Sequence, residues 1–357
     1  MPKTAADTQD ILGVAPFSLL DRHGSLTEEG RAHDFALADL QGLYRDMYLG
    51  RRFDHQAQTL QRQGELGLWL MAWGQEAAQV GSIRGVRDTD FVFPSYREHV
   101  AALCRGLGPE ELLPQWRGTT HAGWKSDDHR FHFYSLVLGV QTLHATGYAM
   151  GLQIDEVDDV VMVYLGDGAT SQGSVNEALN WAAAVRAPVV FFCQNNGWAI
   201  STPTTGQFAS PPHVRARGFG LQAELVDGND VLAVRDVTRR LSEVARSGGG
   251  PVFIEAITYR RAGHSTSDDP GRYRTSSDDD YWIERDPLTR LEVLLRASGA
   301  TDPYFADLEA EGDALAERTR TVCRSLEEPD LRDLFDKVYA EHHEHLAEQA
   351  REFEAGR

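Results

Sequence analysis

Continuous apolar runs of strand length alternate with helix-like segments through the middle of the chain. Three such runs lie at 159–165, 188–193 and 251–258. Between them, 171–185 is rich in alanine and 229–246 ends at three successive glycines, and both segments predict helices. Strands that are apolar throughout and are separated by helices are typical of a mostly parallel sheet covered by helices on both faces. The pattern therefore predicts an α/β fold.

The segments on either side of this region have different patterns. Residues 1–34 mix short apolar patches with glycine, proline and charge, which predicts an N-terminal arm. We expect an α/β domain over 35–285 and a helical region over 286–357, where the sequence becomes charged and rich in Ala, Glu and Leu. The polar segment 262–280 predicts a long loop, and loops of that length inside a compact domain are usually functional.

Composition and charge narrow the class of protein. Of 357 residues, 41% are hydrophobic and 25% are charged, which is typical of a globular protein. There are 54 Asp and Glu against 35 Lys and Arg, for a net charge of −19, so nucleic acid is not expected as a partner. Three scattered cysteines suit a reducing compartment. No export signal or membrane-spanning apolar stretch is visible, so we expect a cytoplasmic protein without a membrane partner.

Two polar turns follow successive predicted strands. Gly166-Asp167-Gly168-Ala169 comes directly after one strand, and Asn195-Asn196-Gly197-Trp198 comes directly after the next. Neighbouring parallel strands end at the same edge of a sheet, so Asp167 and Asn196 are expected to lie close together. A carboxylate, an amide oxygen and a nearby backbone carbonyl are hard oxygen ligands, which suit Mg²⁺ or Ca²⁺ rather than zinc.

A phosphorylated ligand fits the same turns. Three protein oxygens leave an octahedral cation with open positions, which phosphate oxygens commonly complete. Gly166 and Gly168 allow backbone N–H groups to approach such a ligand, and the N-terminus of the following helix favours its negative charge. The two turns therefore predict a site for a cation and a phosphorylated ligand.

The spacing of the two turns, and the segments around them, resemble a known family. Gly166-Asp167-Gly168, followed after 26 residues by Asn195-Asn196, is similar to the signature that binds thiamine diphosphate. Over roughly residues 35–340 the chain resembles the alpha subunit of the E1 component of 2-oxo acid dehydrogenase complexes. Five segments carry this resemblance: WGQEAAQVGS, FPSYREH, GDGATSQGSVNEALNWAA, CQNNGWAIST and YRRAGHSTSDDPGRYRT.

The resemblance implies roles for individual residues around a metal ion and a cofactor. Asp167, Asn196 and the backbone carbonyl of Trp198 would hold Mg²⁺. The other expected contacts are all with thiamine diphosphate: backbone groups of Gly166, Gly168 and Ala169 near the diphosphate, Tyr96 and Arg97 at its terminal phosphate, and the backbone of Leu138 at the aminopyrimidine ring.

His264 matches a histidine beside the reactive carbon of the cofactor, where it would orient the substrate or move protons. Ser265 falls where animal homologues are phosphorylated, in a loop that must order for catalysis. The chain departs from the family at Gln194, where branched-chain members carry Arg, and at Trp198, where Tyr is usual. A backbone carbonyl ligand tolerates the second change, whereas the first removes one possible partner of the phosphate.

The resemblance also implies partners. The family takes the carboxylate that activates thiamine from a second α/β domain, and the helical residues after 286 do not supply one. We therefore expect an E1 beta subunit, an α₂β₂ heterotetramer, and acyl transfer to a lipoylated E2 acyltransferase. Branched-chain 2-oxo acids are the favoured substrates, with pyruvate dehydrogenase and acetoin dehydrogenase alpha subunits as alternatives.

Simpler interpretations remain open from the sequence alone. Asp167 between two glycines, and Asn195-Asn196-Gly197, are each good turn chemistry without any ligand. Arg97 would by default be a surface charge, and His264 a solvated histidine. Two other functions are alternatives: a Mg²⁺-dependent phosphohydrolase that uses Asp167, and a non-catalytic scaffold subunit with a decayed site.

Overall fold

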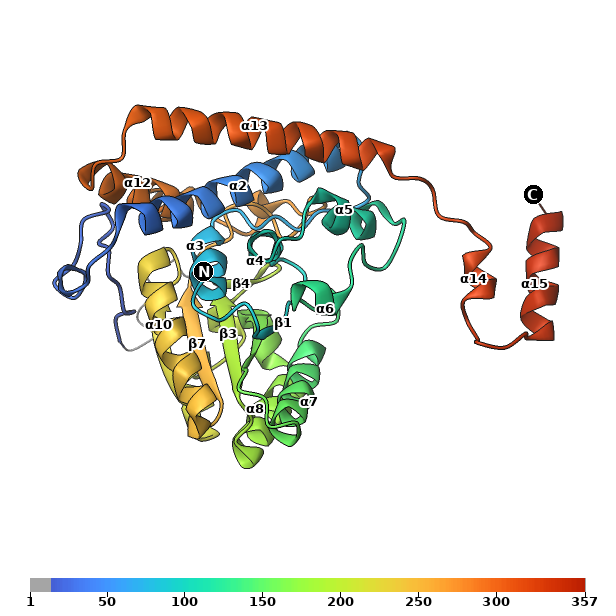
Figure 1. Ribbon diagram of the computed structural model, residues 1–357, viewed down its shortest axis with the longest axis horizontal. Coiled ribbons are helices and arrows are strands. Elements are labelled where there is room, and N and C mark those ends of the chain that lie inside the picture. Colours follow the sequence, from blue (N-terminus) through green and yellow to red (C-terminus); the bar gives the residue numbers. More distant parts are fainter. Residues whose placement is uncertain (1–13, 357) are drawn as a thin grey trace.

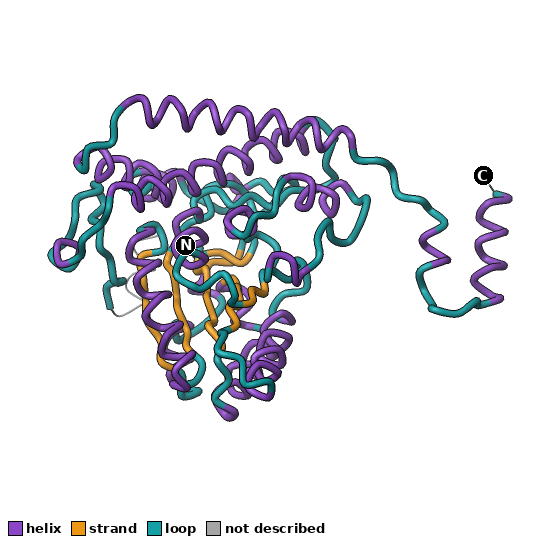
Figure 2. Tube along the Cα trace, viewed as in Figure 1, coloured by secondary structure: helices purple, strands orange, loops and turns teal. Residues whose placement is uncertain are grey.

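A five-stranded parallel sheet forms the centre of the chain in a computed structural model that describes residues 14–356. The predicted α/β fold is confirmed: every pair of neighbouring strands in this sheet is parallel, in the order β1-β2-β3-β7-β6. Figure 2 shows the strands in the interior with helices around them. The strands are β1 (Phe91–Phe93), β2 (Val161–Gly166), β3 (Val189–Asn195), β6 (Gln222–Asp227) and β7 (Val252–Ile257). A separate small pair is formed by β4 (Trp198–Ala199) and β5 (Thr202–Pro203).

Helices cover both faces of the sheet. One face carries α3 (Glu76–Ile83) and α10 (Val231–Val244), and the other carries α7 (Val140–Ile154), α8 (Gly173–Val185) and α9 (Pro212–Gly218). An outer layer packs on α3 and crosses the molecule above the sheet (Figure 1). It consists of α2 (Leu37–Arg62), α12 (Pro287–Ala297) and α13 (Asp302–Ser325), and the short helices are α4 (His99–Cys104), α5 (Pro109–Arg117) and α6 (Ser126–His129).

Alternate residues of each central strand enter two different hydrophobic cores. In β2, Met162 and Tyr164 belong to the core beneath α3 and α10, whereas Val161, Val163 and Leu165 belong to the core beneath α7 and α8. Side chains alternate between the two faces of a strand, so a strand buried on both faces must be apolar at every position. This is why the central strands could be recognised as uninterrupted apolar runs.

The two edge regions and the loop before the C-terminal helices differ from the predicted elements. β1 and β6 had no strand signal, because β1 is only three residues long and the edge strand β6 exposes polar residues such as Gln222. The loop predicted over 262–280 was wrong at its end, since α11 (Ser276–Ile283) begins there. The C-terminal region is helical as expected, although α14 (Asp333–Asp336) and α15 (Glu344–Ala355) are separated from α13 and from each other by non-helical segments.

The described part of the predicted arm lies against the body of the protein. Leu19 and Leu20 are buried, and their backbone N–H groups both donate to the carboxylate of Asp230, at the start of α10. Phe17 also forms a parallel bridge with Val226 of β6. The remainder of the predicted arm, residues 1–13, lies outside the described residues.

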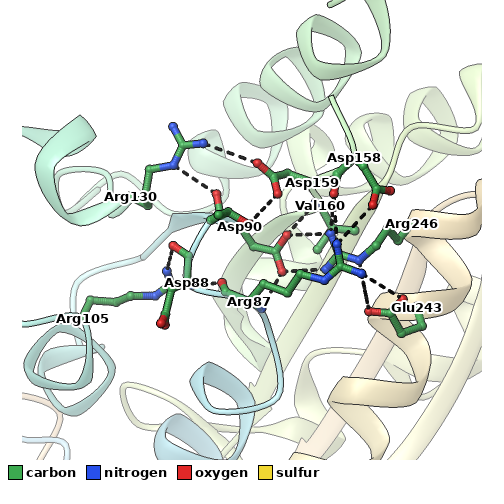
Figure 3. A network of polar contacts seen from close by, with 11 residues as sticks. Arg87, Asp88, Asp90, Arg105, Arg130, Asp158, Asp159, Val160, Glu243 and Arg246 are labelled. Atoms are coloured by element: carbon green, nitrogen blue, oxygen red, sulfur yellow. Dashed lines mark hydrogen bonds and ion pairs between the residues drawn. The ribbon is translucent and has the colours of Figure 1, made fainter. Parts of the chain in front are cut away.

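A network of ion pairs ties the amino ends of the first two strands to the end of α10 (Figure 3). Asp90, directly before β1, is fully buried and pairs with Arg246, with 2.8 Å between Oδ2 and Nη2. The Asp90 carboxylate also accepts hydrogen bonds from the backbone N–H groups of Arg87 and Val160. The start of β1 and the start of β2 are therefore both fixed to one buried carboxylate.

The last two helices extend away from the rest of the molecule (Figure 1). α14 and α15 pack on each other and leave Leu334, Val338 and Tyr339 more than half exposed.

Within residues 14–356, no helix is both long and apolar enough to cross a membrane.

Candidate functional site

A cavity of about 330 Å³ lies at the carboxyl ends of β2, β3 and β7, and every residue predicted to bind metal or cofactor lines it. Six separate chain segments meet there, because the parallel strands all end at this edge. The ten predicted residues at this cavity are Tyr96, Arg97, Leu138, Gly166, Asp167, Gly168, Ala169, Asn196, Trp198 and His264.

Asp167 stands at the point where β2 ends and a short 3₁₀ turn, η2 (Asp167–Ser171), begins. Its carboxyl group is buried, and burial raises its pKa to about 6; hydrogen bonds from the Gln207 side chain and the Asn196 backbone act in the opposite direction. Gly168 is required by close packing, since a Cβ atom there would lie 2.7 Å from the Cβ atom of Ala199. A bound cation would stabilise the charged form of this buried carboxyl group.

The turn at Asn196 is held in place by hydrogen bonds of the preceding residue, Asn195. Asn195 ends β3, and its side-chain amide donates to Oε1 of the buried Glu255 at 2.6 Å. The Asn195 Oδ1 atom accepts from the backbone N–H of Gly197, which has a positive φ of +83°. Glycine adopts that conformation without steric cost, so the chain turns sharply and leaves Asn196 on the cavity wall.

Arg97, on the cavity wall, holds together its own segment, the backbone of Met71 and the backbone of His264. Its guanidinium group donates to the backbone oxygen of Met71 at 2.6 Å and to that of His264 at 2.8 Å. It also lies over the ring of Tyr96, with 5.5 Å between the Arg97 Cζ atom and the ring centroid. Arg97 is only 5% exposed, so it is a buried cation at the cavity and not a surface charge.

His264 is neutral in this arrangement. Its Nδ1 atom faces the guanidinium groups of Arg97, at 3.4 Å, and Arg260, at 3.3 Å. Because guanidinium groups only donate hydrogen bonds, Nδ1 is the acceptor and the ring hydrogen is on Nε2. Burial lowers the His264 pKa to about 3, with the positive charges of Arg97 and Arg260 acting in the same direction.

The loop that carries His264 is organised by one carboxylate. Asp268 accepts hydrogen bonds from the His264 backbone N–H, at 2.6 Å, and from the Tyr273 hydroxyl. Trp69 and Thr266 exchange two hydrogen bonds, which fasten this loop to the segment that also contacts Arg97. These hydrogen bonds therefore hold the part of the predicted functional loop that carries His264 in a defined conformation.

Gln194, which stands where branched-chain members of the resembled family carry arginine, makes specific contacts. Its amide nitrogen donates to Oε1 of Glu98 at 2.6 Å, and its amide oxygen accepts from Gln79 at 3.3 Å. Glu98 also accepts from the backbone N–H groups of Ser95 and Arg97, and burial raises its pKa. Gln194 thus supports the turn that carries Tyr96 and Arg97 without adding a positive charge.

Leu138 lies on a partly exposed apolar section of the cavity wall. It precedes α7, next to Gly139, whose φ is +86° and where a Cβ atom would lie 2.8 Å from the Val175 side chain. Leu136 and Ile200 also line the cavity and are more than half exposed. One part of the cavity wall therefore presents apolar side chains, and it adjoins the charged part, since the Arg260 guanidinium group donates to the backbone oxygen of Ile200 at 3.1 Å.

Sequence reasoning did not single out three further residues of the cavity. Arg260 is fully buried beside His264, although it lies in the YRRAGHSTSDD segment that was available as a signal. Gln75 Nε2 and Gln141 Oε1 are buried on the wall without a hydrogen-bond partner, and only the fold brings them there. Within residues 14–356, no group of three or more His, Cys, Asp or Glu side chains could hold a metal ion, so any cation here would use amide or carbonyl oxygens as well.

Comparisons with known proteins agree with this geometry. The family model described as "Dehydrogenase E1 component" matches residues 44–317. The chain belongs to the dehydrogenase E1 component family. This E1 chain is 42% identical over 334 residues to the 3-methyl-2-oxobutanoate dehydrogenase subunit alpha of Mycobacterium tuberculosis, covering 92% of this chain and 90% of that protein.

Other relatives of the E1 chain come from two subfamilies. It is 34% identical over 348 residues to a mitochondrial 2-oxoisovalerate dehydrogenase subunit alpha of Arabidopsis thaliana, covering 94% of this chain and 74% of that protein. It is also 34% identical over 343 residues to a pyruvate dehydrogenase E1 component subunit alpha of Acholeplasma laidlawii, covering 93% and 97%. Membership of this family implies an enzyme that uses thiamine diphosphate, which disfavours the phosphohydrolase interpretation.

Proposed function

We propose that this E1 chain is the alpha subunit of a branched-chain 2-oxo acid dehydrogenase. Acting with a beta subunit, it would decarboxylate acids such as 3-methyl-2-oxobutanoate and transfer the acyl group to a lipoylated E2 partner. The observation that carries the proposal is the meeting of Asp167, Asn196, Arg97 and His264 in one cavity. The 42% identity to a 3-methyl-2-oxobutanoate dehydrogenase subunit alpha supports the choice of substrate.

The residues at the two strand ends fit a magnesium ion. Asp167 offers a buried carboxylate, Asn196 an amide oxygen and Trp198 a backbone carbonyl, all at the cavity wall. These are hard oxygen ligands, and no histidine or thiolate is among them, so Mg²⁺ suits the set better than zinc. The two turns would hold the ion while leaving positions for phosphate oxygens.

The residues around the turns fit a diphosphate group. The backbone of Gly168 and Ala169 borders the cavity without side chains that would block it, and Arg97 and Arg260 place two buried positive charges there. Tyr96 and Arg97 would contact the terminal phosphate, as the family resemblance implies. These two guanidinium groups favour an anionic ligand, whose negative charge would offset theirs.

His264 would act on the substrate as a hydrogen-bond donor. When bound, thiamine diphosphate supplies the electron sink for decarboxylation of a 2-oxo acid. The neutral His264 ring carries its hydrogen on Nε2, since Nδ1 accepts from Arg97 and Arg260. It can therefore hold a substrate oxygen in place, and Arg97 and Arg260 fix the orientation of the ring while it does so.

An apolar wall supports a substrate with an aliphatic side chain. Leu136 and Ile200 expose hydrocarbon surface at the cavity mouth, and burial of an added methyl or methylene group there is favourable by roughly 1 kcal/mol. A preference of this size is modest, so pyruvate remains the second candidate substrate. The 34% identity to a pyruvate dehydrogenase E1 component subunit alpha supports this second candidate.

The test uses this chain copurified with its coexpressed beta subunit. Initial rates with Mg²⁺, thiamine diphosphate and an artificial electron acceptor are compared for 3-methyl-2-oxobutanoate, pyruvate and acetoin, with the alpha chain alone as the control. We expect turnover only in the assembly, and a higher kcat/KM for the branched acid. A higher kcat/KM for pyruvate would overturn the substrate assignment, and turnover by the alpha chain alone would overturn the shared active site.

A further inference from the structure

Helix α9 reaches both of the turns that supply the proposed metal ligands. This seven-residue helix follows the Asn196 turn in the chain and packs on β6 and β7. Two of its side chains, His213 and Arg215, point to different turns: one to the strand end beneath Asn196, the other to the turn that begins at Asp167. The same short helix therefore reaches both turns through side chains that do not themselves line the cavity.

His213 contacts the Asn196 turn through a buried carboxylate. Both the backbone N–H and the ring Nδ1–H of His213 donate to Oε2 of Glu255, at 2.9 Å and 2.6 Å. The other oxygen of Glu255 accepts from the side-chain amide of Asn195 at 2.6 Å. His213, Glu255 and Asn195 are each at most 2% exposed. The orientation of the Asn195 amide, and with it the turn to Asn196, is set by these contacts.

Arg215 contacts the Asp167 turn directly. Its guanidinium group donates to the backbone oxygen of Thr170 at 3.1 Å and to the Thr170 hydroxyl at 2.6 Å. The Thr170 hydroxyl in turn donates to the backbone oxygen of Asp167 at 2.7 Å. Arg215 therefore holds the closing end of the 3₁₀ turn in which Asp167 is the first residue.

We infer that His213 and Arg215 are positioning residues that set the separation of Asp167 and Asn196 for the metal ion. The inference rests on the proposed function, because it concerns the Mg²⁺ site. Mg²⁺ demands near-ideal octahedral geometry, so two ligands on separate turns must be held at a fixed separation. Residues behind metal ligands commonly affect metal affinity by 10-fold to 100-fold without touching the ion.

The helix offers a matched control. Arg217 lies on the same helix, and its guanidinium group donates to the backbone oxygen of Ala223 in β6, away from both turns. Arg215→Met and Arg217→Met remove the same charge and the same kind of donor from one helix. If α9 merely stabilises the fold, the two variants will have similar effects; if Arg215 positions Asp167, only Arg215→Met will change metal affinity.

The experiment measures retention of thiamine diphosphate by equilibrium dialysis over a series of Mg²⁺ concentrations. It uses the full chain assembled with its beta subunit, and thermal unfolding is recorded for each variant. For Arg215→Met and Glu255→Gln, we expect the Mg²⁺ concentration for half-maximal retention to rise about tenfold or more. For Arg217→Met it should change by less than about twofold, and Arg215→Lys, which keeps one donor group, should fall between.

Two results would overturn the inference, and they are distinguishable. If the wild-type assembly retains thiamine diphosphate without any dependence on Mg²⁺, the proposed metal site is wrong and the inference fails with it. If the wild type depends on Mg²⁺ and Arg215→Met changes that dependence no more than Arg217→Met does, the metal site stands and the role of α9 is wrong.

Discussion

Arg97 and His264 are 167 positions apart in the chain, and the Arg97 guanidinium group donates both to the backbone oxygen and toward the ring of His264. The same guanidinium group holds the backbone of Met71. One side chain therefore helps to fix the position of a loop, the orientation of a ring and the protonation state of that ring. Replacement of Arg97 should affect all three together.

For Arg97→Lys we expect weaker binding of thiamine diphosphate and a looser His264 loop. Lysine keeps the charge but cannot reach Met71 and His264 at once, because it lacks the planar fork of the guanidinium group. The apparent Kd for thiamine diphosphate should rise about tenfold or more, since a charged hydrogen bond contributes about 1.5–3 kcal/mol. Calorimetric titration measures the change, and limited proteolysis reports whether the loop over 262–275 opens.

A suitable control is Arg239→Lys, on the exposed side of α10, where the side chain makes one weak pair at 3.4 Å. That variant should match the wild type in both assays. Equal cofactor affinity in Arg97→Lys and wild type would contradict the assignment of Arg97 to the phosphate.

The depressed pKa of His264 makes the cofactor-free protein sensitive to acid. Its pKa is about 3 in the folded chain, whereas an ordinary histidine has a pKa near 6.5. Between these values the unfolded chain binds a proton that the folded chain does not, so this residue lowers stability as the pH falls through 6.5 toward 3. His264→Gln should therefore show a smaller loss of Tm between about pH 7.5 and about pH 5.5.

Thermal unfolding of the two proteins at both pH values measures this effect. The comparison cancels the contribution of other buried histidines such as His99, whose pKa is also lowered to about 3 by burial. An equal loss of Tm in the variant and the wild type would show that His264 is protonated normally.

Asp54 supports the segment that Arg97 and the His264 loop share. This fully buried carboxylate on α2 accepts from the Trp69 indole at 2.8 Å and from the backbone N–H groups of Ala72, at 3.0 Å, and Trp73, at 3.1 Å. Asp54→Ala leaves two buried donors and one part-buried donor unpaired, which should cost about 3 kcal/mol or more in free energy of unfolding. Urea denaturation measures this cost, and Asp313→Ala, at a largely exposed position, should cost less than about 1 kcal/mol.

Replacement of Asp90 should lower the stability of the fold without weakening the binding of thiamine diphosphate. It pairs with Arg246 (Figure 3) directly before β1, at the amino ends of the strands, whereas the cavity lies at their carboxyl ends. Asp90→Ala would leave Arg246 with only the half-exposed Glu243 as an ion-pair partner and would leave the backbone N–H groups of Arg87 and Val160 without their acceptor, at an expected cost of about 3 kcal/mol. The apparent Kd for thiamine diphosphate, measured well below the Tm of the variant, should be unchanged. A higher Kd in this variant would mean that the two ends of the strands are energetically coupled.

The C-terminal helices should be dispensable for folding of the α/β body. α14 and α15 extend from the molecule and pack on each other (Figure 1). A chain that ends at Ser325 should keep the circular dichroism of the remaining helices and a Tm within about 4 °C of the wild type. A larger fall in Tm would show that residues 326–357 stabilise the body.

Much of the fold could be predicted because burial leaves a clear sequence pattern. β2, β3 and β7 are covered on both faces, so each appears as an uninterrupted apolar run, as the split of β2 between two cores shows. β6 could not be recognised in this way, because it is an edge strand with exposed polar residues such as Gln222. The start of α11 at Ser276 was missed because SSDDD alone is equally typical of a loop.

The residues of the site also differ in whether a local sequence pattern predicts their position. Asp167 and Asn196 were predictable because each directly follows a recognisable strand, and the parallel order of strands brings their turns together. The positions of Gln75 and Gln141 depend on how helices pack over the strand ends, which no local pattern encodes. Arg260 lies in a segment that the family resemblance had already marked, but its burial beside His264 arises from the fold of the whole loop.

The parallel order of the strands also determines when the site can exist during folding. Its residues come from segments between positions 75 and 264, and helices lie between successive strands of the five-stranded sheet along the chain, so no contiguous fragment shorter than this span contains the cavity. Contacts between such distant segments form late and slowly. Binding of thiamine diphosphate during refolding should therefore be the last event observed, after the helices and the sheet have formed.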